Sequence, residues 1–379
     1  MIRHILRLLA FAAASIVVIG VLLWTLRGQL LRWAGVSFDT GQAEVGGLRV
    51  PDGYAIAAFA EGLAGPRFMA VAADGTLLVA ERGADRVVAL PDRDGDGRAD
   101  EQVVVGAGYD GAHSLALAPD GTLLVAGSGT LFQVEIGPDL RERSRRAILD
   151  LPPGGQHSTR TVAFLPDGRI LVSVGSSCNV CLETDPRRAA ILVVAGDGAD
   201  ARVLMRGLRN AVGVAIDPAT GAAWATNNGR DLLGDDLPPE TLYRVADGAD
   251  AGWPRCHAGT IVDPEFGRQG DRPGCQDVVM PAATFQAHMA PLGLAFWDGA
   301  AFIAFHGSWN RSTKVGYEVD RLPWLDGPTG ETEPFLTGFL DPATEDSRGR
   351  PAGLVVGSDG ALYISDDKAG AIYRVTRAP

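Results

Sequence analysis

Histidine and arginine residues recur at one kind of position in this chain, directly before a short apolar run that is typical of a β-strand. The stretch GGQHSTRTVAFLPDGRILVSVG places His157 two residues after paired glycines and just before such a run. Histidine suits general-base chemistry because its ordinary pKa, about 6.5, lies near neutral pH. A solvated surface histidine is the alternative interpretation. The other polar residues that precede such runs are Arg67, His113, Arg160, Arg209, Asn210, His288, Arg348 and Arg350.

The apolar runs belong to one repeated pattern: a strand, a tight turn, a second strand, a polar turn and a third strand. An Asp-Gly pair between two hydrophobic runs, as in LAPDGTLLVA, is a strong signal for a β-hairpin. Repeats of this length that each form a small antiparallel sheet are typical of propeller blades. They predict an all-β fold, a six-bladed β-propeller over residues 50–379. The copies span residues 68–90, 114–136, 161–180, 213–231, 293–311 and 353–375.

A propeller would bring these scattered polar residues together. The loops that enter the innermost strands converge on one end of the central channel. Because every copy supplies a histidine or an arginine there, the sequence predicts a polar funnel that binds an anion. The long segment 231–280 between the fourth and fifth copies is expected to be a loop excursion, and long loops in compact folds are usually functional.

The composition limits the class of protein. A chain of 379 residues can bury a large core as one domain or as two. The formal net charge of −12 argues against a nucleic-acid partner, which needs clustered positive charge.

The N-terminal segment differs from the rest of the chain. Residues 8–26 form an uncharged run of nineteen residues, which as a helix would span roughly the hydrocarbon core of a bilayer. Arginines stand on both sides of the run, so the charge signal for orientation is ambiguous. No small-x-small cleavage site follows the run. We therefore expect a single N-terminal transmembrane helix in residues 1–34, a linker over 35–49 and a periplasmic body held at the inner membrane. A cleaved export signal is the alternative.

The four cysteines fit an exported protein. Cys178 and Cys181 form a C-x-x-C pair, but Leu182 stands where a haem attachment site needs histidine. Cys256 and Cys275 lie nineteen positions apart. Disulfides in an oxidising compartment are the favoured interpretation, with the pairing left open.

Several motifs, in this order, resemble one known family. The chain from about residue 50 is similar to the pyrroloquinoline-quinone (PQQ) dependent soluble aldose dehydrogenases of the glucose/sorbosone dehydrogenase class, and most similar to the sorbosone dehydrogenase-like branch. The motifs are QHSTRTVAFLPDG, GLRNAVGVAIDP, NNGRDLLGDDLPPE followed by GWP, HMAPLGLAF, HGSWNR and SRGRPAGLVVGSDGALYISDD.

The resemblance implies roles for particular residues. It makes His157 the general base that takes the hydroxyl proton while hydride leaves the sugar carbon for the quinone. Arg209 and Asn210 would face the quinone carbonyls, with Arg209 stabilising the oxyanion that develops. Arg348 and Arg350 would bind the carboxylates of PQQ, because guanidinium groups pair bidentately with carboxylates.

The resemblance also implies a Ca²⁺ ion that polarises the quinone oxygen as a Lewis acid. Its ligands would be the backbone carbonyls of Gly229 and Arg230 with Asp235 or Asp236 as the acid. His288 would lie beside the cofactor.

Some positions depart from the glucose-specific members of the class. Gln156, Val212 and Ala251 stand where those enzymes carry polar or aromatic groups, and Arg311 rather than Lys314 is taken as the counterpart of their cofactor-binding lysine. We therefore expect an aldose or an aldehyde sugar such as sorbosone as substrate, rather than glucose. The electron acceptor would be a periplasmic or membrane cytochrome or quinone.

Two other functions and one further metal site stay open from the sequence. Calcium-dependent lactone hydrolases also use propellers, and a propeller can bind a ligand without catalysis. The stretch DRDGDGRADE spaces Asp92, Asp94, Asp96 and Asp100 like a calcium loop, but Val103 stands where an EF-hand needs an acid. An acidic hairpin is favoured there over structural calcium.

Overall fold

The computed structural model describes residues 44–118, 120–268 and 273–378. The predicted membrane helix in residues 1–34 lies outside these ranges, so it stays a prediction. Within the described ranges, no helix has the length and hydrophobicity needed to cross a membrane.

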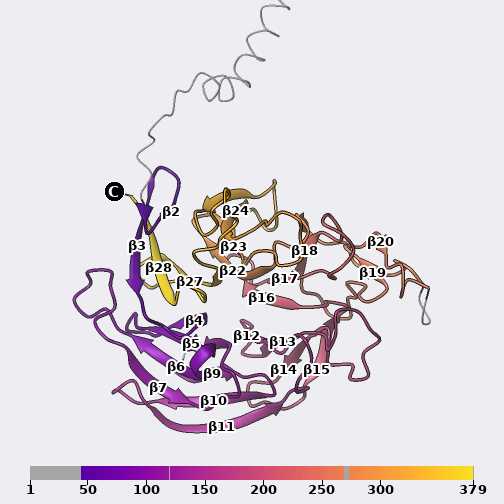
Figure 1. Cartoon of the computed structure of the whole chain (residues 1–379). Helices are drawn as coiled ribbons and strands as arrows, with labels where there is room; N and C mark the ends of the chain where they lie inside the picture. Colours follow the sequence, from indigo (N-terminus) through magenta and orange to yellow (C-terminus); the bar gives the residue numbers. More distant parts are fainter. Residues whose placement is uncertain (1–43, 119, 269–272, 379) are drawn as a thin grey trace, which may run out of the picture. The chain divides into compact units, whose positions relative to one another are not determined.

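Six antiparallel sheets of four strands each form the body of the protein, which confirms the predicted six-bladed propeller (Figure 1). Blade 1 contains β4 (Pro66–Val71), β5 (Leu77–Glu81), β6 (Arg86–Leu90) and β7 (Val103–Ala107). Blade 2 contains β8 (Ser114–Leu117), β9 (Leu123–Ala126), β10 (Thr130–Ile136) and β11 (Glu142–Asp150). Blade 3 contains β12 (Arg160–Phe164), β13 (Ile170–Val174), β14 (Ala190–Val194) and β15 (Arg202–Arg206).

The remaining three blades follow the same plan. Blade 4 contains β16 (Ala211–Ile216), β17 (Ala223–Asn227), β18 (Glu240–Arg244) and β21 (Ala283–Phe285). Blade 5 contains β22 (Pro291–Trp297), β23 (Ala300–Phe305), β24 (Glu318–Pro323) and β25 (Glu333–Leu336). Blade 6 contains β26 (Pro351–Val356), β27 (Leu362–Asp366), β28 (Ala371–Arg377) and, from the other end of the chain, β3 (Tyr54–Ala60).

The ring closes through blade 6. Strand β3 pairs antiparallel with β28, so the indigo and yellow ends of the chain lie side by side in Figure 1. Successive first strands contact one another around the channel, and β26 contacts β4. This closure leaves no open edge between the first and last blades.

The Asp-Gly turns and the burial of the strands explain why the repeats form blades. Gly75 and Gly121 have φ values of +90° and +87°, a conformation that side chains with a Cβ rarely adopt. Every residue of β5 and of β13 is buried, as expected for strands covered on both faces by neighbouring blades.

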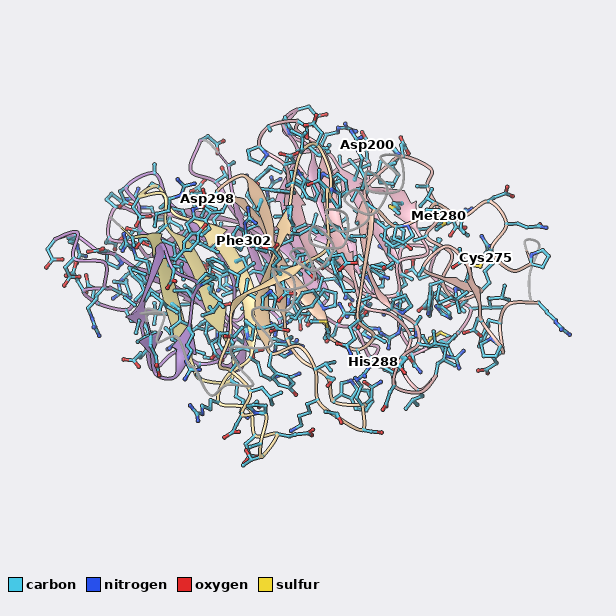
Figure 2. The ribbon with its side chains drawn as sticks, turned by 90° about the horizontal axis from the view of Figure 1, so that it is seen from above. Asp200, Cys275, Met280, His288, Asp298 and Phe302 are labelled. Atoms are coloured by element: carbon cyan, nitrogen blue, oxygen red, sulfur yellow. A yellow bond between two sulfur atoms is a disulfide. The ribbon has the colours of Figure 1, made fainter. Side chains whose placement is uncertain are left out.

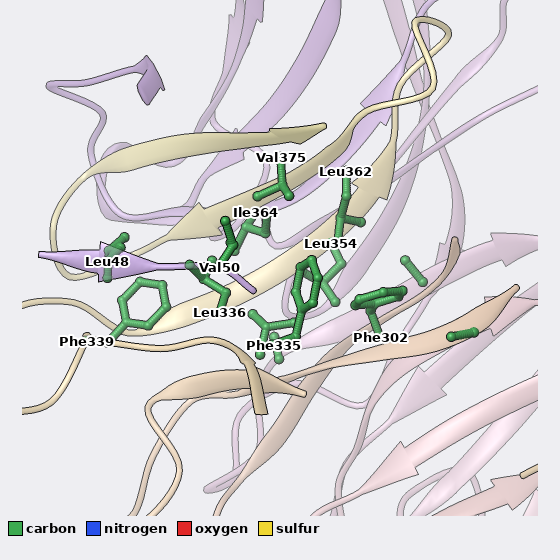
Figure 3. Close-up of a cluster of buried hydrophobic side chains, with 14 of the residues drawn as sticks. Leu48, Val50, Phe302, Phe335, Leu336, Phe339, Leu354, Leu362, Ile364 and Val375 are labelled. Atoms are coloured by element: carbon green, nitrogen blue, oxygen red, sulfur yellow. The ribbon is translucent and has the colours of Figure 1, made fainter. Parts of the chain in front are cut away.

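The core is divided among the gaps between blades. Figure 3 shows the cluster between blades 5 and 6, where Phe302, Phe335 and Leu362 pack together. Leu48 and Val50, which are 3% and 1% exposed, belong to this cluster. Residues 44–49 therefore pack as part of the body, through the hairpin of β1 (Glu44–Val45) and β2 (Leu48–Arg49), where a linker was expected.

The predicted excursion over 231–280 is shorter than expected, because β18 of blade 4 lies inside it. The loop between β18 and β21 carries a small hairpin of β19 (Cys256–His257) and β20 (Ile261–Val262). The Cys256–Cys275 disulfide closes this loop, and a second disulfide joins Cys178 to Cys181. The prediction of disulfides is thus confirmed.

Candidate active site

The predicted polar residues gather at one end of the propeller, which we call the site end. In an antiparallel blade, the first strand begins where the second strand ends, so both supply residues to the same end. Figure 2 shows His288, before β22, and Asp298, after β22, on opposite sides of the molecule. The site-end residues that lie at the start of a first strand or just before one are Arg67, His113, His157, Arg209, His288 and Arg350, and those that follow second strands are Ser176, Asn228, His306 and Asp367.

The hydrogen bonds of His157 determine its tautomer. Its Nδ1 atom lies 2.8 Å from the hydroxyl oxygen of Ser176 and 3.1 Å from the Ser176 carbonyl oxygen. That hydroxyl donates its own hydrogen to the carbonyl oxygen of Cys178 at 2.6 Å. Both oxygens therefore act as acceptors toward Nδ1, so Nδ1 carries the proton and Nε2 keeps its lone pair. No described residue bonds to Nε2.

The electrostatics of the site keep this imidazole neutral. Burial, and secondarily the positive charge of Arg209, lower the pKa of His157 to about 3. The imidazole is therefore in the unprotonated form that a general base needs throughout the physiological pH range, although the lowered pKa also makes it a weaker base.

The neighbouring Arg209 is 3% exposed and held by several acceptors. Its Nη2 atom donates to the carboxylate of Asp231 at 2.6 Å and to the side-chain oxygen of Asn179 at 2.9 Å. Its Nη1 atom donates to the carbonyl oxygen of Gly229 at 2.6 Å, and its Nε atom donates to the Asn179 carbonyl at 2.9 Å. Burial lowers the pKa of Arg209, while the carboxylates of Asp231 and Glu240 raise it.

Asp231 connects this group to His288. The carboxylate accepts a hydrogen bond from the side-chain amide of Asn310 at 2.9 Å, and its Oδ1 atom lies 4.0 Å from Nδ1 of His288. Nε2 of His288 lies 2.9 Å from the carbonyl oxygen of Gly234. A carbonyl only accepts, so Nε2 carries the proton of His288.

A second polar group lies at the start of blade 1 and the ends of the second strands of blades 5 and 6. Arg67 forms an ion pair with Asp367, whose two oxygens each lie 3.0 Å from Nε2 of His306. Arg350 donates to the carbonyl oxygens of His306 and Gly307 at 2.9 and 2.7 Å. Burial, opposed by Asp367 and reinforced by Arg67, lowers the pKa of His306 to about 4.

The two arginines of the R-x-R pair separate. Arg350 points into the site end, whereas the side chain of Arg348 is 61% exposed and lies beside Gly47, 4.0 Å from Asp341. The structure does not bring Arg348 to the other site residues. Asn210 and His157 both lie against Gly175: a Cβ built on Gly175 would lie 2.5 Å from Cβ of His157 and 2.8 Å from Oδ1 of Asn210.

Two other residues at the starts of first strands use their side chains to bind backbone carbonyl oxygens. Arg160 donates its hydrogen bonds to the carbonyl oxygens of His157, Thr159 and Pro152, each at 2.8 Å. Nδ1 of His113 lies 3.0 Å from the carbonyl oxygen of Arg160, so Nδ1 is its protonated nitrogen. These two side chains support the loops of the site end.

The residues predicted for calcium lie in different surroundings. The carbonyl oxygen of Gly229 faces Arg209, but the side chain of Arg230 turns away to pair with Asp263. The side chain of Asp236 is 87% exposed, and its Oδ1 atom lies 3.4 Å from Nη2 of Arg311. Asp235 accepts from the backbone N–H of Ser312 at 3.1 Å, and its carbonyl accepts from Arg311.

Two acids that the sequence analysis did not single out lie in the site: Asp231 beside Arg209, and Asp367 beside Arg67 and His306. Asp231, Asn179, Ser176 and His306 are the main contributors that it missed. Each follows the second strand of a blade, and a search for polar residues at that position as well as before first strands would have found them. In the separate acidic loop, carboxylate oxygens of Asp92, Asp94 and Asp96 lie within 4.8 Å of one another, and structural calcium there stays the alternative to the predicted acidic hairpin.

The residues of the site end fit an anion with several carboxylates. Burial is the main cause that lowers the pKa of His113, His157 and His306, and the positive charge of neighbouring arginines lowers each of them further. The site end also contains three oxygens of the kind that a hard cation prefers: the Gly229 carbonyl and the Asp231 carboxylate, which both accept hydrogen bonds from Arg209, and the side-chain oxygen of Asn310. The last is buried and accepts no hydrogen bond from any described residue.

Comparison with known proteins places the chain in a family. The sequence model of the TrAA12-like family matches residues 48–239 and 255–378. The chain belongs to the TrAA12-like family. It is 27% identical over 400 residues to a "Pyrroloquinoline quinone-dependent pyranose dehydrogenase" of Coprinopsis cinerea, covering 87% of this chain and 54% of that protein. It is 27% identical over 285 residues to a "Pyrroloquinoline quinone-dependent sugar dehydrogenase" of Hypocrea jecorina, covering 61% of this chain and 65% of that one.

Solved structures agree with this membership. The holo PQQ domain of the Coprinopsis cinerea pyranose dehydrogenase superposes with a TM-score of 0.77 at 25% identity, covering 87% of this chain and 97% of that domain. A calcium structure of the Trichoderma reesei family AA12 enzyme has the same fold, with a TM-score of 0.77 at 23% identity over 89% of this chain and 98% of that one. The family therefore contains PQQ-dependent sugar dehydrogenases. The match spans 54% of the length of the pyranose dehydrogenase and 65% of the length of the sugar dehydrogenase.

Proposed function

We propose that this TrAA12-like protein oxidises an aldose or an aldehyde sugar, with PQQ and Ca²⁺ bound at the site end of the propeller. The observation that carries the proposal is the neutral His157, whose free Nε2 lone pair lies in a funnel of buried arginines next to Arg209. A base beside concentrated positive charge suits a reaction that removes a proton from a hydroxyl while negative charge develops nearby.

Each site residue has one task in this reaction. When bound, PQQ with its calcium ion supplies the electrophilic carbonyl that takes hydride from the sugar carbon. His157 accepts the hydroxyl proton at Nε2, and Ser176 holds the ring by its Nδ1–H. Arg209 places a fixed positive charge where the oxyanion develops, in a buried position where such charge acts strongly.

Other residues hold the cofactor. Arg350 uses Nε and Nη2 on backbone carbonyls and keeps Nη1 unbonded among the described residues, so Nη1 is available to a carboxylate. Arg67 adds a second positive charge, although Asp367 neutralises part of it. The Gly229 carbonyl, Asp231 and Asn310 would hold the calcium ion.

The narrower expectations are proposals as well. The proposed substrate is an aldose or an aldehyde sugar such as sorbosone rather than glucose. The proposed electron acceptor is a periplasmic or membrane cytochrome or quinone. The two disulfides support an oxidising compartment. The proposed location is the periplasmic face of the inner membrane, with residues 1–34 as the anchor.

Reconstitution tests the proposal. The full-length chain, purified in mild detergent and stripped with a chelator, is assayed by reduction of an artificial dye with a panel of aldoses. Dye reduction should need PQQ and Ca²⁺ together, and should be absent with either one alone. A chain that hydrolyses lactones with calcium alone, or that shows no PQQ-dependent turnover with any aldose, would contradict the proposal.

A further inference from the structure

The Cys178–Cys181 disulfide lies beside the proposed catalytic groups. It closes a ring of four residues, which we call the cysteine ring, in the loop that follows β13. The hydroxyl of Ser176 donates to the carbonyl oxygen of Cys178 at 2.6 Å, and the same hydroxyl oxygen lies 2.8 Å from Nδ1 of His157. One end of the cysteine ring therefore reaches the proposed base through a single side chain.

Inside the ring, Asn179 binds the other proposed catalytic group. Its carbonyl oxygen accepts from Nε of Arg209 at 2.9 Å and from the indole N–H of Trp253 at 3.3 Å. Its side-chain oxygen accepts from Nη2 of Arg209 and from the backbone N–H of Asp231, each at 2.9 Å. Its side-chain amide donates to the Asp231 carbonyl oxygen at 3.1 Å. The backbone and the side chain of one residue thus bind the Nε and Nη2 atoms of the guanidinium group.

We propose that the cysteine ring positions two groups for the reaction. Asn179 orients Arg209, and the Cys178 carbonyl orients His157 through the hydroxyl of Ser176. The inference rests on the proposed function and adds positioning residues to the same site. The disulfide restricts the backbone on both sides of Asn179, so an open ring frees the Asn179 carbonyl and the Cys178 carbonyl together. Cys178 and Cys181 are only partly buried, so a reductant can reach them.

The expected effect is on turnover more than on substrate binding. Misplacing a reacting or charge-stabilising group by about 1 Å can lower the rate roughly 100-fold, even when the change lies away from the chemistry. A group that acts mainly in the transition state lowers kcat and leaves KM nearly unchanged. A disulfide that only stabilises the fold would change neither constant in the folded enzyme.

The matched variants are Asn179→Ala, Asn179→Asp, Val180→Ala and the pair Cys178→Ser with Cys181→Ser. In the PQQ- and Ca²⁺-loaded full chain, Asn179→Ala and the opened ring should lower kcat about 10- to 100-fold with little change in KM. Asn179→Asp keeps the oxygen acceptor for Arg209 but loses the amide donor to the Asp231 carbonyl, so it should recover part of kcat. Val180→Ala keeps the closed ring and should match the parent. The reductant TCEP should lower kcat in the parent and in a Cys256→Ser, Cys275→Ser variant, but not further in the opened ring.

A readout without cofactor separates this inference from the proposed function. Histidine-selective NMR of the ligand-free chain follows the titration of His157, which faces the charges of Arg209 and Arg160. Opening the ring should let Arg209 move and should raise the pKa of His157 above that of the parent. An unchanged titration together with unchanged kcat in folded Asn179→Ala and opened-ring variants would overturn the inference. If the parent shows no dye-linked turnover, the proposed function fails while the NMR result still decides the positioning role.

Discussion

The Nδ1 atom of His157 lies 2.8 Å from the hydroxyl oxygen of Ser176, and this contact decides which nitrogen of the imidazole is free. Ser176 follows the second strand of blade 3, whereas His157 precedes the first strand, so the hairpin of the blade itself brings the pair together. Gly175 allows the approach, because a Cβ there would lie 2.5 Å from Cβ of His157. The base is thus oriented by the fold before any ligand binds.

The first prediction concerns the base itself. His157→Ala should lower kcat by about 10²–10⁴-fold, the usual contribution of a general base, because no other described group bonds at that position. PQQ affinity, measured by quenching of tryptophan fluorescence, should stay within about threefold of the parent, because His157 adds no charge that an anion needs. Turnover equal to that of the parent would favour the alternative interpretation, in which His157 is a solvated loop residue with no catalytic role.

The second prediction concerns pH. A base is active when unprotonated, so a pKa lowered by burial and by Arg209 moves the loss of activity on acidification to lower pH. The acid limb of kcat/KM should therefore lie well below pH 6.5, the ordinary value for histidine. Arg209→Gln removes the nearby positive charge and should move that limb upward. An acid limb at or above pH 6.5 in the parent would contradict the described environment of His157.

The third prediction uses the two arginines of the R-x-R pair as a matched test. Arg350→Gln should weaken PQQ binding about 10-fold or more, because a hydrogen bond to a charged group contributes on the order of 1.5–3 kcal/mol. Arg348→Gln should leave PQQ affinity nearly unchanged, since this side chain is 61% exposed beside Gly47 and Asp341. Equilibrium titration of the apo chain with PQQ measures both. Equal losses for the two variants would mean that Arg348 also reaches the cofactor.

The blades could be predicted from the sequence because their signals are local. Each Asp-Gly turn and each apolar run lies within one hairpin, and glycines such as Gly75 adopt the positive φ that the turn needs. The convergence of His157, Arg209 and Arg350 followed from counting six such repeats around a closed ring.

The contacts of the loops could not be predicted in the same way. Arg348 and Arg350 would point to the same side if both lay in a regular strand, because residues i and i+2 share one face there. Both precede β26, however, and the backbone N–H of Arg348 bonds to the carbonyl oxygen of Phe339, so their side chains diverge. Asp231 and Asn179 lie 52 residues apart and meet only because two loops from different blades pack together. No local pattern carries that information.

The fourth prediction concerns stability. Burial raises the pKa of Asp320 to about 6 and, with Asp320 beside it, that of Glu318 to about 7. The folded state therefore keeps protons that the unfolded chain releases near pH 4, and the free energy of unfolding falls as pH rises from about 4 to about 7. Asp320→Asn removes one of the two acids that cause this fall in the free energy of unfolding. The variant should therefore be more stable than the parent at pH 7.5, by on the order of 2 kcal/mol, with little gain in stability at pH 4.5.

Urea unfolding of the full chain at the two pH values measures this effect. Glu331→Gln, an exposed acid in the same region of the chain, is the control and should leave the pH dependence unchanged. A difference between Asp320→Asn and the parent that does not vary with pH would show that burial does not hold the proton on Asp320.

The last prediction concerns the substrate. Val212 is 2% exposed and packs with Phe68, Leu292 and Ala352 in an apolar cluster of first-strand residues, so it offers no hydrogen bond to a sugar. Ala251 is also buried, at 3% exposure. A pocket that hydrogen-bonds a hydroxyl discriminates far more strongly than an apolar one, so the loss of polar groups at these positions should weaken and broaden selection. The value of kcat/KM for glucose should therefore be lower than for other aldoses or for sorbosone, measured across a panel with the reconstituted enzyme. Glucose as the best substrate by 10-fold or more, about 1.4 kcal/mol in transition-state binding, would show that other residues supply the missing contacts.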